Sequence, residues 1–169
     1  MSGEHVEALG TEEFGAFVDG LDYPMYVVTV ASGGERSGCL VGFTTQVGIA
    51  PPRFLVCLSA RNHTYSLATG ARSLAVHLLG PEQHGLARLF GEETGDELDK
   101  FAECRWRPGP EEVPILEDCA RYFVGRVVAQ VAFGDHIGFV LEPTEMGAGD
   151  AGAVLTFSDV KDMTPGHGA

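Results

Sequence analysis

Residues 38–64 read GCLVGFTTQVGIAPPRFLVCLSARNHT, and this stretch decides how the chain folds. It begins with a loop of small residues and reaches Pro51-Pro52, where the chain must leave any sheet because proline has no N–H to donate. The apolar run over residues 54–58 then predicts a strand that is buried on both faces. A polar cluster at residues 59–64 follows this strand and leads into a short predicted helix.

The sequence on either side of this stretch predicts a mainly β fold. Segments rich in β-branched and aromatic residues, bounded by Gly, Pro or Asp, are typical of strands. We expect a hairpin in which residues 25–30 pair with a strand that begins near Arg36, and a longer one with Gly134-Asp135 at its tip. The other strands are predicted at residues 73–79, 120–133, 137–141 and 153–157. Together these strands predict an antiparallel, barrel-like sheet.

A few short helices are predicted around this sheet. Thr11 and the two acids after it suit a helix N-terminus, and Gly20 marks the end of that helix. Its apolar residues, Phe14, Phe17, Val18 and Leu21, share one face. Further helices are expected over residues 64–70 and 82–90, the latter ended by a left-handed cap at Gly91. Residues 91–117 read as a surface excursion with little helix.

The composition predicts one domain over residues 1–169, with a core over about 14–157 and flexible termini. With 24 acidic and 11 basic side chains, the net charge is -13. This charge argues against nucleic acid and against an anionic membrane, because both bind through basic patches. The first residues lack the basic and apolar regions of a secretory signal, and no apolar run is long enough to span a bilayer.

The four cysteines, Cys39, Cys57, Cys104 and Cys119, show no Cys-x-x-Cys spacing. Such cysteines are typical of reduced, buried thiols in a cytosolic protein, so we expect a cytoplasmic location. No constellation of His, Cys and carboxylates predicts a metal site.

The order of these motifs resembles the flavin reductase family of FMN-binding split barrels. The resemblance rests on Gly42-Phe43-Thr44-Thr45-Gln46-Val47, Pro51-Pro52, residues 54–58, residues 59–64 and Gly134-Asp135-His136. It implies an antiparallel split β-barrel that pairs as a homodimer and binds FMN, with FAD as the alternative. It also implies an NAD(P)H-dependent flavin reductase that uses NADH or NADPH and supplies reduced flavin to a monooxygenase.

The resemblance places Thr44, Thr45, Gln46 and Val47 along the edge of the flavin ring. Without the resemblance, the same residues read equally as a turn whose hydroxyl groups bond their own backbone. Gly42, Phe43 and Gly48 stand where the family commonly has small polar residues, so the contacts to the ring edge are expected to differ.

Ser59, Arg61, Asn62, His63 and Thr64 form the expected phosphate site. They bring hydroxyl, guanidinium, amide and imidazole donors to a helix start, where free N–H groups favour an anion. The alternative is that Asn62 caps the helix and the other polar groups face water. The family usually has a small hydroxyl residue at the place of Asn62.

His136 is the expected redox-site residue, because the resemblance puts this histidine at the mouth of the site, against the nicotinamide or the flavin. Without the resemblance it reads as a hairpin-tip residue. His77 lies in a predicted strand, and a place in the core or in a subunit interface is favoured over contact with the flavin. Two other functions stay open: a flavin carrier or sensor without useful reductase activity, and a flavoenzyme that acts directly on an organic substrate.

Overall fold

The computed structural model describes residues 6–92 and 99–164 of the 169-residue chain. Seven antiparallel strands form its main sheet, in the order β2-β1-β5-β8-β9-β4-β3. These strands are β1 (Tyr26–Ser32), β2 (Glu35–Val41), β3 (Thr44–Gly48), β4 (Arg53–Ser59), β5 (Ser73–Leu78), β8 (Tyr122–Ala132) and β9 (His136–Met146). A small ribbon of β6 (Trp106–Pro108) and β7 (Pro114–Leu116) lies beside them. The predicted mainly β, antiparallel fold is therefore confirmed.

Short helices lie around the sheet. They are α1 (Thr11–Val18), α2 (His63–Ala68), α3 (His84–Glu92) and α4 (Phe157–Val160), with 3-10 turns at Lys100–Ala102 and Pro110–Glu112. None of the helices in residues 6–92 and 99–164 is long and apolar enough to cross a membrane.

Both predicted hairpins are present. β1 pairs with β2 across Gly33 and Gly34, which both have positive φ, a conformation that glycine adopts without steric cost. β8 pairs with β9 across a tip at Gly134, whose φ is 93°. Because β9 extends to Met146, this second hairpin is longer than the sequence predicted.

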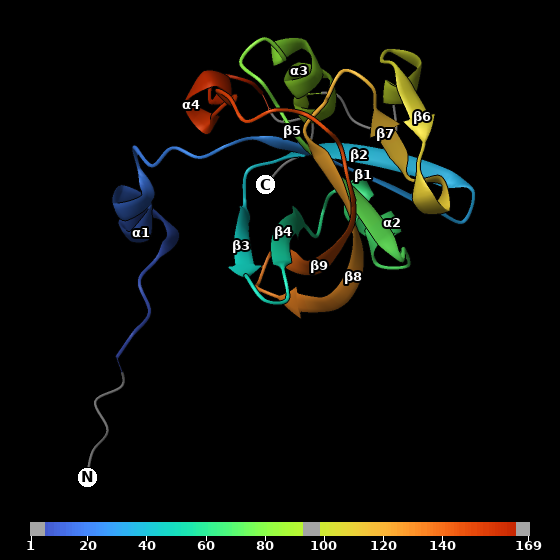
Figure 1. Ribbon diagram of the computed structural model, residues 1–169. Helices are drawn as coiled ribbons and strands as arrows, with labels where there is room; N and C mark the ends of the chain where they lie inside the picture. The colour runs from blue at the N-terminus through green and yellow to red at the C-terminus, as the bar shows by residue number, and fades with distance from the viewer. Residues whose placement is uncertain (1–5, 93–98, 165–169) are drawn as a thin grey trace.

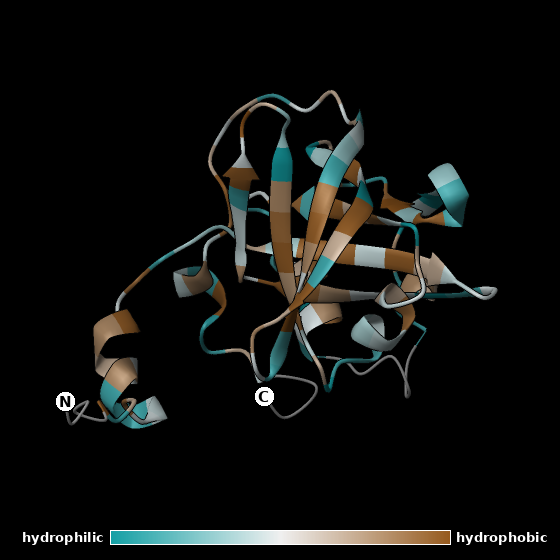
Figure 2. Ribbon diagram, turned by 90° about the horizontal axis from the view of Figure 1, so that it is seen from below, coloured by the Kyte–Doolittle hydropathy of each residue, from teal (hydrophilic) through white to brown (hydrophobic). Residues whose placement is uncertain are grey.

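The sheet curves around an apolar core, and α2 lies against β1, β2 and β4 (Figure 1). Figure 2 shows hydrophobic residues along the strands of the sheet, and successive side chains of a strand point to opposite faces. The enclosed core includes Val28, Val30, Cys39, Val41, Val56, Leu58, Leu74, Val76, Phe139 and Leu141. A second core lies under α3 and α4 and includes Val27, Leu79, Phe90, Phe101, Leu116, Leu155 and Val160.

Two expectations for the stretch 38–64 were wrong. Residues 44–48 form the edge strand β3 rather than a loop, and they pair with β4. β4 in turn is not buried on both faces: Val56 and Leu58 are buried, whereas Leu55 and Cys57 are half-buried. Leu55 and Cys57 lie on the outer face of β4, which the described residues cover only in part.

Two element ends also differ from the prediction. Gly91 lies inside α3 rather than capping it, and a Cβ there would come within 2.9 Å of Leu40, so the glycine permits close packing of the helix on β2. Residues 153–157 add no strand; Thr156 makes a single bridge with Pro24. Asp159 instead accepts hydrogen bonds from the Thr156 backbone and side chain, and this capping starts α4.

The first predicted helix is present as α1, but its apolar face packs on nothing in the described part of the chain. α1 contains no buried residue. Figure 1 shows it standing away from the sheet, at the end of an extended segment. The flexible ends expected from the sequence include residues 1–5 and 165–169, which lie outside the described residues.

Candidate functional site

The end of β4 and the start of β9 bring the two predicted halves of the site together. Ser59 pairs with His136 in the β4–β9 register, and the Ala60 N–H donates to the Asp135 carbonyl over 2.9 Å. This pairing places the loop after Ser59 beside the Gly134-Asp135-His136 tip. The structure thus joins the expected phosphate loop and the expected redox-site histidine, which lie more than 70 residues apart in sequence.

His136 is held by its neighbour in sequence. Its Nδ1 lies 2.8 Å from Oδ1 of Asp135, and this hydrogen bond is the main cause that lowers the pKa of the Asp135 carboxyl. A carboxylate at Nδ1 keeps the proton on that nitrogen, so Nε2 is the ring nitrogen left for a ligand. The positive charge of Arg61 also contributes to lowering the pKa of Asp135, so Arg61 lies in the same electrostatic neighbourhood.

Phe43 adds an aromatic surface that the sequence reading did not assign. Its ring centroid lies 5.1 Å from that of His136, and its side chain is 55% exposed. On its other side, Phe43 meets Tyr23, which stacks on Phe157 at 5.0 Å. The signal was present in the sequence as an aromatic residue where the resembling family has a small polar one. The four rings form a row that ends at His136.

The four residues expected at the ring edge divide between the two faces of β3. Thr44 pairs with the fully buried Val56, and Gln46 lines an inner cavity, so both belong to the inner face. Thr45 and Val47 alternate with them and belong to the outer face, the side that also carries His136. Only Thr45 and Val47 therefore share a face with His136.

The alternative reading of these residues is also seen. Thr45 Oγ1 donates to the Gln46 carbonyl over 3.2 Å, and Gln46 Nε2 donates to the Gly48 carbonyl over the same distance. Burial raises the pKa of Tyr26, and a hydrogen bond with Thr44 partly offsets this effect. Thr44 thus has an inner-face partner.

Several polar groups of the expected phosphate loop form hydrogen bonds within the protein. Asn62 Oδ1 accepts the Thr64 N–H over 2.9 Å, which confirms that Asn62 caps α2. Thr64 is buried, and its hydroxyl lies 2.8 Å from that of Ser37 on β2. Ser59 is also buried, and its Oγ accepts the Arg61 N–H over 3.4 Å. Arg61 and His63 add a guanidinium group and an imidazole to this loop.

His77 is a core residue, as the sequence favoured. It is fully buried, its Nδ1 lies 3.0 Å from the Val27 carbonyl oxygen, and its Nε2 accepts the Leu116 N–H over 3.0 Å. The Leu116 N–H can only donate, so Nε2 of His77 must be the unprotonated nitrogen. Nδ1 then carries the proton and donates it to the Val27 carbonyl, and the ring is neutral. Burial lowers the pKa of His77 to about 4.

This lowered pKa predicts an acid-sensitive fold. The unfolded chain takes up the His77 proton below its ordinary pKa of about 6.5, whereas the folded chain does so only near pH 4. The free energy of unfolding should therefore fall by about 2 kcal/mol between pH 7.5 and pH 5 through this group alone. Urea titrations of the wild type and of His77→Gln measure the difference. A fall of the same size in His77→Gln would assign the acid sensitivity to other groups.

Gly42 leaves room for the aromatic row. A Cβ at this position would lie 2.5 Å from Cε2 of Tyr23 and 3.2 Å from Sδ of Met25. We expect Gly42→Ala to lower the free energy of unfolding by about 1–3 kcal/mol, because the Tyr23 ring must shift from its stack on Phe157. Gly85→Ala is the matched control, since a Cβ there meets nothing within 4 Å and alanine favours a helix. Equal free energies of unfolding for Gly42→Ala and the wild type would show that the Tyr23 ring can shift without loss of stability.

Within residues 6–92 and 99–164, no three His, Cys, Asp or Glu side chains are grouped to hold a metal ion. The four cysteines are free thiols, and two of them, Cys39 and Cys119, are buried.

Comparison with known proteins gives a consistent picture. Residues 18–163 match the sequence profile of the flavin reductase like domain. A probable flavin reductase from Rhizobium meliloti is 32% identical over 130 residues, which cover 75% of this chain but only 39% of that protein. The FMN reductase (NADH) RutF of Variovorax paradoxus is 30% identical, covering 79% of this chain and 73% of RutF.

Two further proteins extend the comparison. The reductase component of a 4-nitrophenol 4-monooxygenase/4-nitrocatechol 2-monooxygenase from Rhodococcus opacus is 29% identical, covering 85% of this chain and 76% of that protein. Among solved structures, a flavin reductase domain protein from Arthrobacter sp. FB24 superposes with a TM-score of 0.78 at 24% identity, covering 88% of this chain and 91% of that one. The structural match concerns the fold alone.

Proposed function

Because this chain belongs to the flavin reductase like family, we propose that it is an NAD(P)H-dependent flavin reductase that binds FMN. One observation carries the proposal: the β4–β9 pairing brings His136, Phe43 and the loop 59–64 to one side of the sheet. An aromatic and apolar surface suits a flavin ring, and a cationic loop beside it suits a phosphate. The residues present therefore fit this cofactor.

Each part of the site has a role in this proposal. Bound flavin would supply the hydride chemistry, accepting a hydride from a nicotinamide. Phe43 offers a face on which a planar ring can stack next to His136. His136 holds a proton donor or acceptor at Nε2, while Asp135 fixes its tautomer through Nδ1. Arg61 and His63, with the start of α2, would bind the phosphate, and Thr45 and Val47 would border the ring.

We also propose that two copies of the chain pair through the outer face of β3, β4 and β9, as a split barrel with its flavin near the interface. Exposed apolar side chains support this pairing, because large apolar patches mark interaction surfaces. They are Phe43, Val47 and Ile49 on or beside β3, and Val131 and Phe133 at the adjoining end of β8. The free thiols support a cytoplasmic location. The Rhodococcus relative supports a monooxygenase as the partner that receives reduced flavin.

Two measurements on the purified protein test the function. The absorption spectrum and the chromophore released on denaturation should identify FMN. NADH or NADPH should then be consumed in the presence of free FMN much faster than without the protein. A yellow protein that does not accelerate this consumption would be a carrier or sensor. NADH oxidation that requires an added organic substrate, rather than free FMN, would indicate a flavoenzyme that acts directly on that substrate.

A further inference from the structure

α1 presents an aromatic stripe that nothing in the described residues covers. Phe14 and Phe17 stack on each other with their ring centroids 5.6 Å apart, yet they are 53% and 73% exposed. Val18 and Leu21 extend this apolar side and are also exposed. A short amphipathic helix is marginal in water without a surface to pack on. We therefore expect this stripe to pack on a partner surface.

The segment after α1 is fixed to the body of the protein. Oδ1 of Asp22 accepts the Ser158 N–H over 2.9 Å, and the Tyr23 carbonyl accepts the Phe157 N–H over 2.9 Å. Met25 in turn donates its N–H to the Leu155 carbonyl over 2.9 Å. These contacts set the direction in which the chain leaves the sheet, and Figure 1 shows α1 projecting away from its own strands. A surface on another molecule is therefore the better placed partner.

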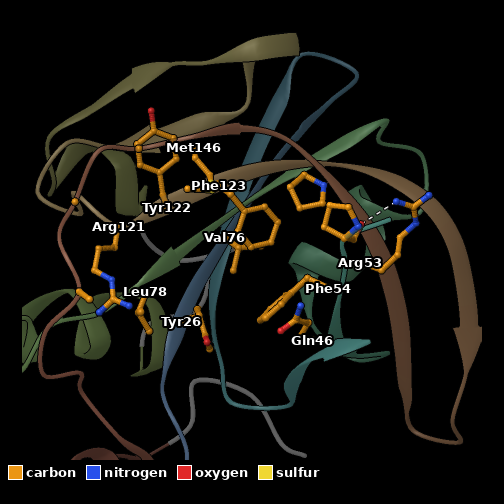
Figure 3. Close-up of a pocket in the computed structure, with 15 residues that line it drawn as sticks. Tyr26, Gln46, Arg53, Phe54, Val76, Leu78, Arg121, Tyr122, Phe123 and Met146 are labelled. Carbon is orange, nitrogen blue, oxygen red and sulfur yellow. Dashed lines mark hydrogen bonds between the residues drawn. The ribbon is translucent and has the colours of Figure 1, made fainter. Parts of the chain in front are cut away.

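A cavity of about 460 Å³, whose lining residues are drawn in Figure 3, includes Met146 at the end of β9, whereas His136 begins that strand. Met146 lies ten positions after His136, which at the usual strand rise is a path of about 30 Å along β9. The cavity is lined by Gln46 on the inner face of β3, whereas Thr45 and Val47, which are proposed to border the flavin ring, lie on the outer face. Its walls are mainly apolar and aromatic, formed by Tyr26, Phe54, Val76, Leu78, Phe123 and Met146.

The charge at this cavity is opposite to that of the α1 segment. Residues 6–21 contain four acidic side chains, Glu7, Glu12, Glu13 and Asp19, and no lysine or arginine. The cavity is bordered by Arg53 and Arg121. Arg53 pairs with Glu142 at 2.8 Å, whereas Arg121 donates to the Gly152 carbonyl and forms no ion pair with the described residues. Arg121 is thus the group that can meet an acidic helix.

We infer that α1 of one chain docks its Phe14–Phe17 stripe into this cavity of a second copy, with its acids toward Arg121. The inference rests on the proposed pairing of two copies and adds an exchanged N-terminal arm to it. Apolar burial supplies the attraction, and the acid–guanidinium contact sets the orientation. A second copy is the occupant argued for because it always carries the helix at the same concentration as the cavity.

Cross-linking between two differently marked chains tests the arm. A tagged Ala16→Cys chain, which keeps both Phe14 and Phe17, is co-expressed with an untagged Met146→Cys chain, and a short bis-maleimide is added. We expect a cross-linked product that contains both chains, which a helix folded back on its own chain cannot give. Replacing Met146→Cys by Glu103→Cys, an exposed position outside the cavity lining, is the matched control. The unmodified pair of chains measures the background from native cysteines.

A charge reversal at Arg121 tests the proposed contact between this guanidinium and the acids of α1. Arg121→Glu in the Met146→Cys chain should lower the yield of the two-chain product about tenfold, while Arg121→Lys should retain most of it. The arm is excluded if the two-chain product does not exceed the control, or if a doubly substituted chain cross-links only within itself. Light scattering distinguishes the two proposals. A monomeric protein would contradict the proposed pairing of two copies, whereas a dimer that gives no two-chain cross-link would contradict only the exchanged arm. The flavin spectrum reports independently on the proposed activity.

Discussion

Replacing His136 by alanine is expected to slow NADH oxidation with FMN roughly 100-fold and to leave FMN affinity nearly unchanged. The imidazole is fixed by Asp135 through Nδ1 and lies beside Phe43, so its remaining nitrogen can exchange a proton with a bound ring. Alanine removes that proton donor or acceptor and leaves the phosphate loop intact. Stopped-flow absorbance at saturating FMN measures the rate, and fluorescence quenching measures the affinity.

Asp135→Asn is the control that separates proton chemistry from packing. Asparagine keeps a hydrogen-bond acceptor near Nδ1 but removes the negative charge. We expect a smaller loss of rate than in His136→Ala, because the imidazole keeps its place and its Nε2. If His136→Ala instead releases the flavin while turnover per bound flavin is unchanged, His136 binds the cofactor and has no part in proton transfer.

The local elements were predictable because local residues determine them. The two hairpins were predicted from the glycines at their tips, because glycine adopts positive φ readily. Gly33, Gly34 and Gly134 do have positive φ in the structure. Asn62 caps α2 through a contact two residues away. His77 lies between apolar residues of a strand, which favours a buried position, and its partners Val27 and Leu116 keep it neutral.

The features that the sequence could not supply depend on contacts between distant segments. The burial of Thr64 against Ser37 needs α2 to lie on β2, which no local pattern specifies. Thr44 and Thr45 face opposite sides because residues 44–48 pair with β4, whereas a loop would have left both directions open. Phe43 was visible in the sequence as a departure from the resembling family. The contact of its ring with His136 is seen only in the structure.

Replacing Arg61 by alanine is expected to weaken FMN binding about thirtyfold and to leave riboflavin binding unchanged. Riboflavin has the same ring as FMN but lacks the phosphate, so the comparison isolates the phosphate contact. Charge-assisted hydrogen bonds contribute about 1.5–3 kcal/mol, which corresponds to roughly ten- to hundredfold in affinity. Fluorescence titration with both ligands measures the difference.

The charge of the whole protein makes this test decisive. At a net charge of -13, the chain as a whole repels an anionic ligand, so local donors must provide the binding. Arg61 lies next to the cap of α2 and is close enough to Asp135 to help lower the pKa of that carboxyl. Arg61→Lys keeps the charge and should lose less affinity than Arg61→Ala. Equal weakening of FMN and riboflavin would mean that Arg61 supports the loop, and no weakening of either would place the phosphate elsewhere.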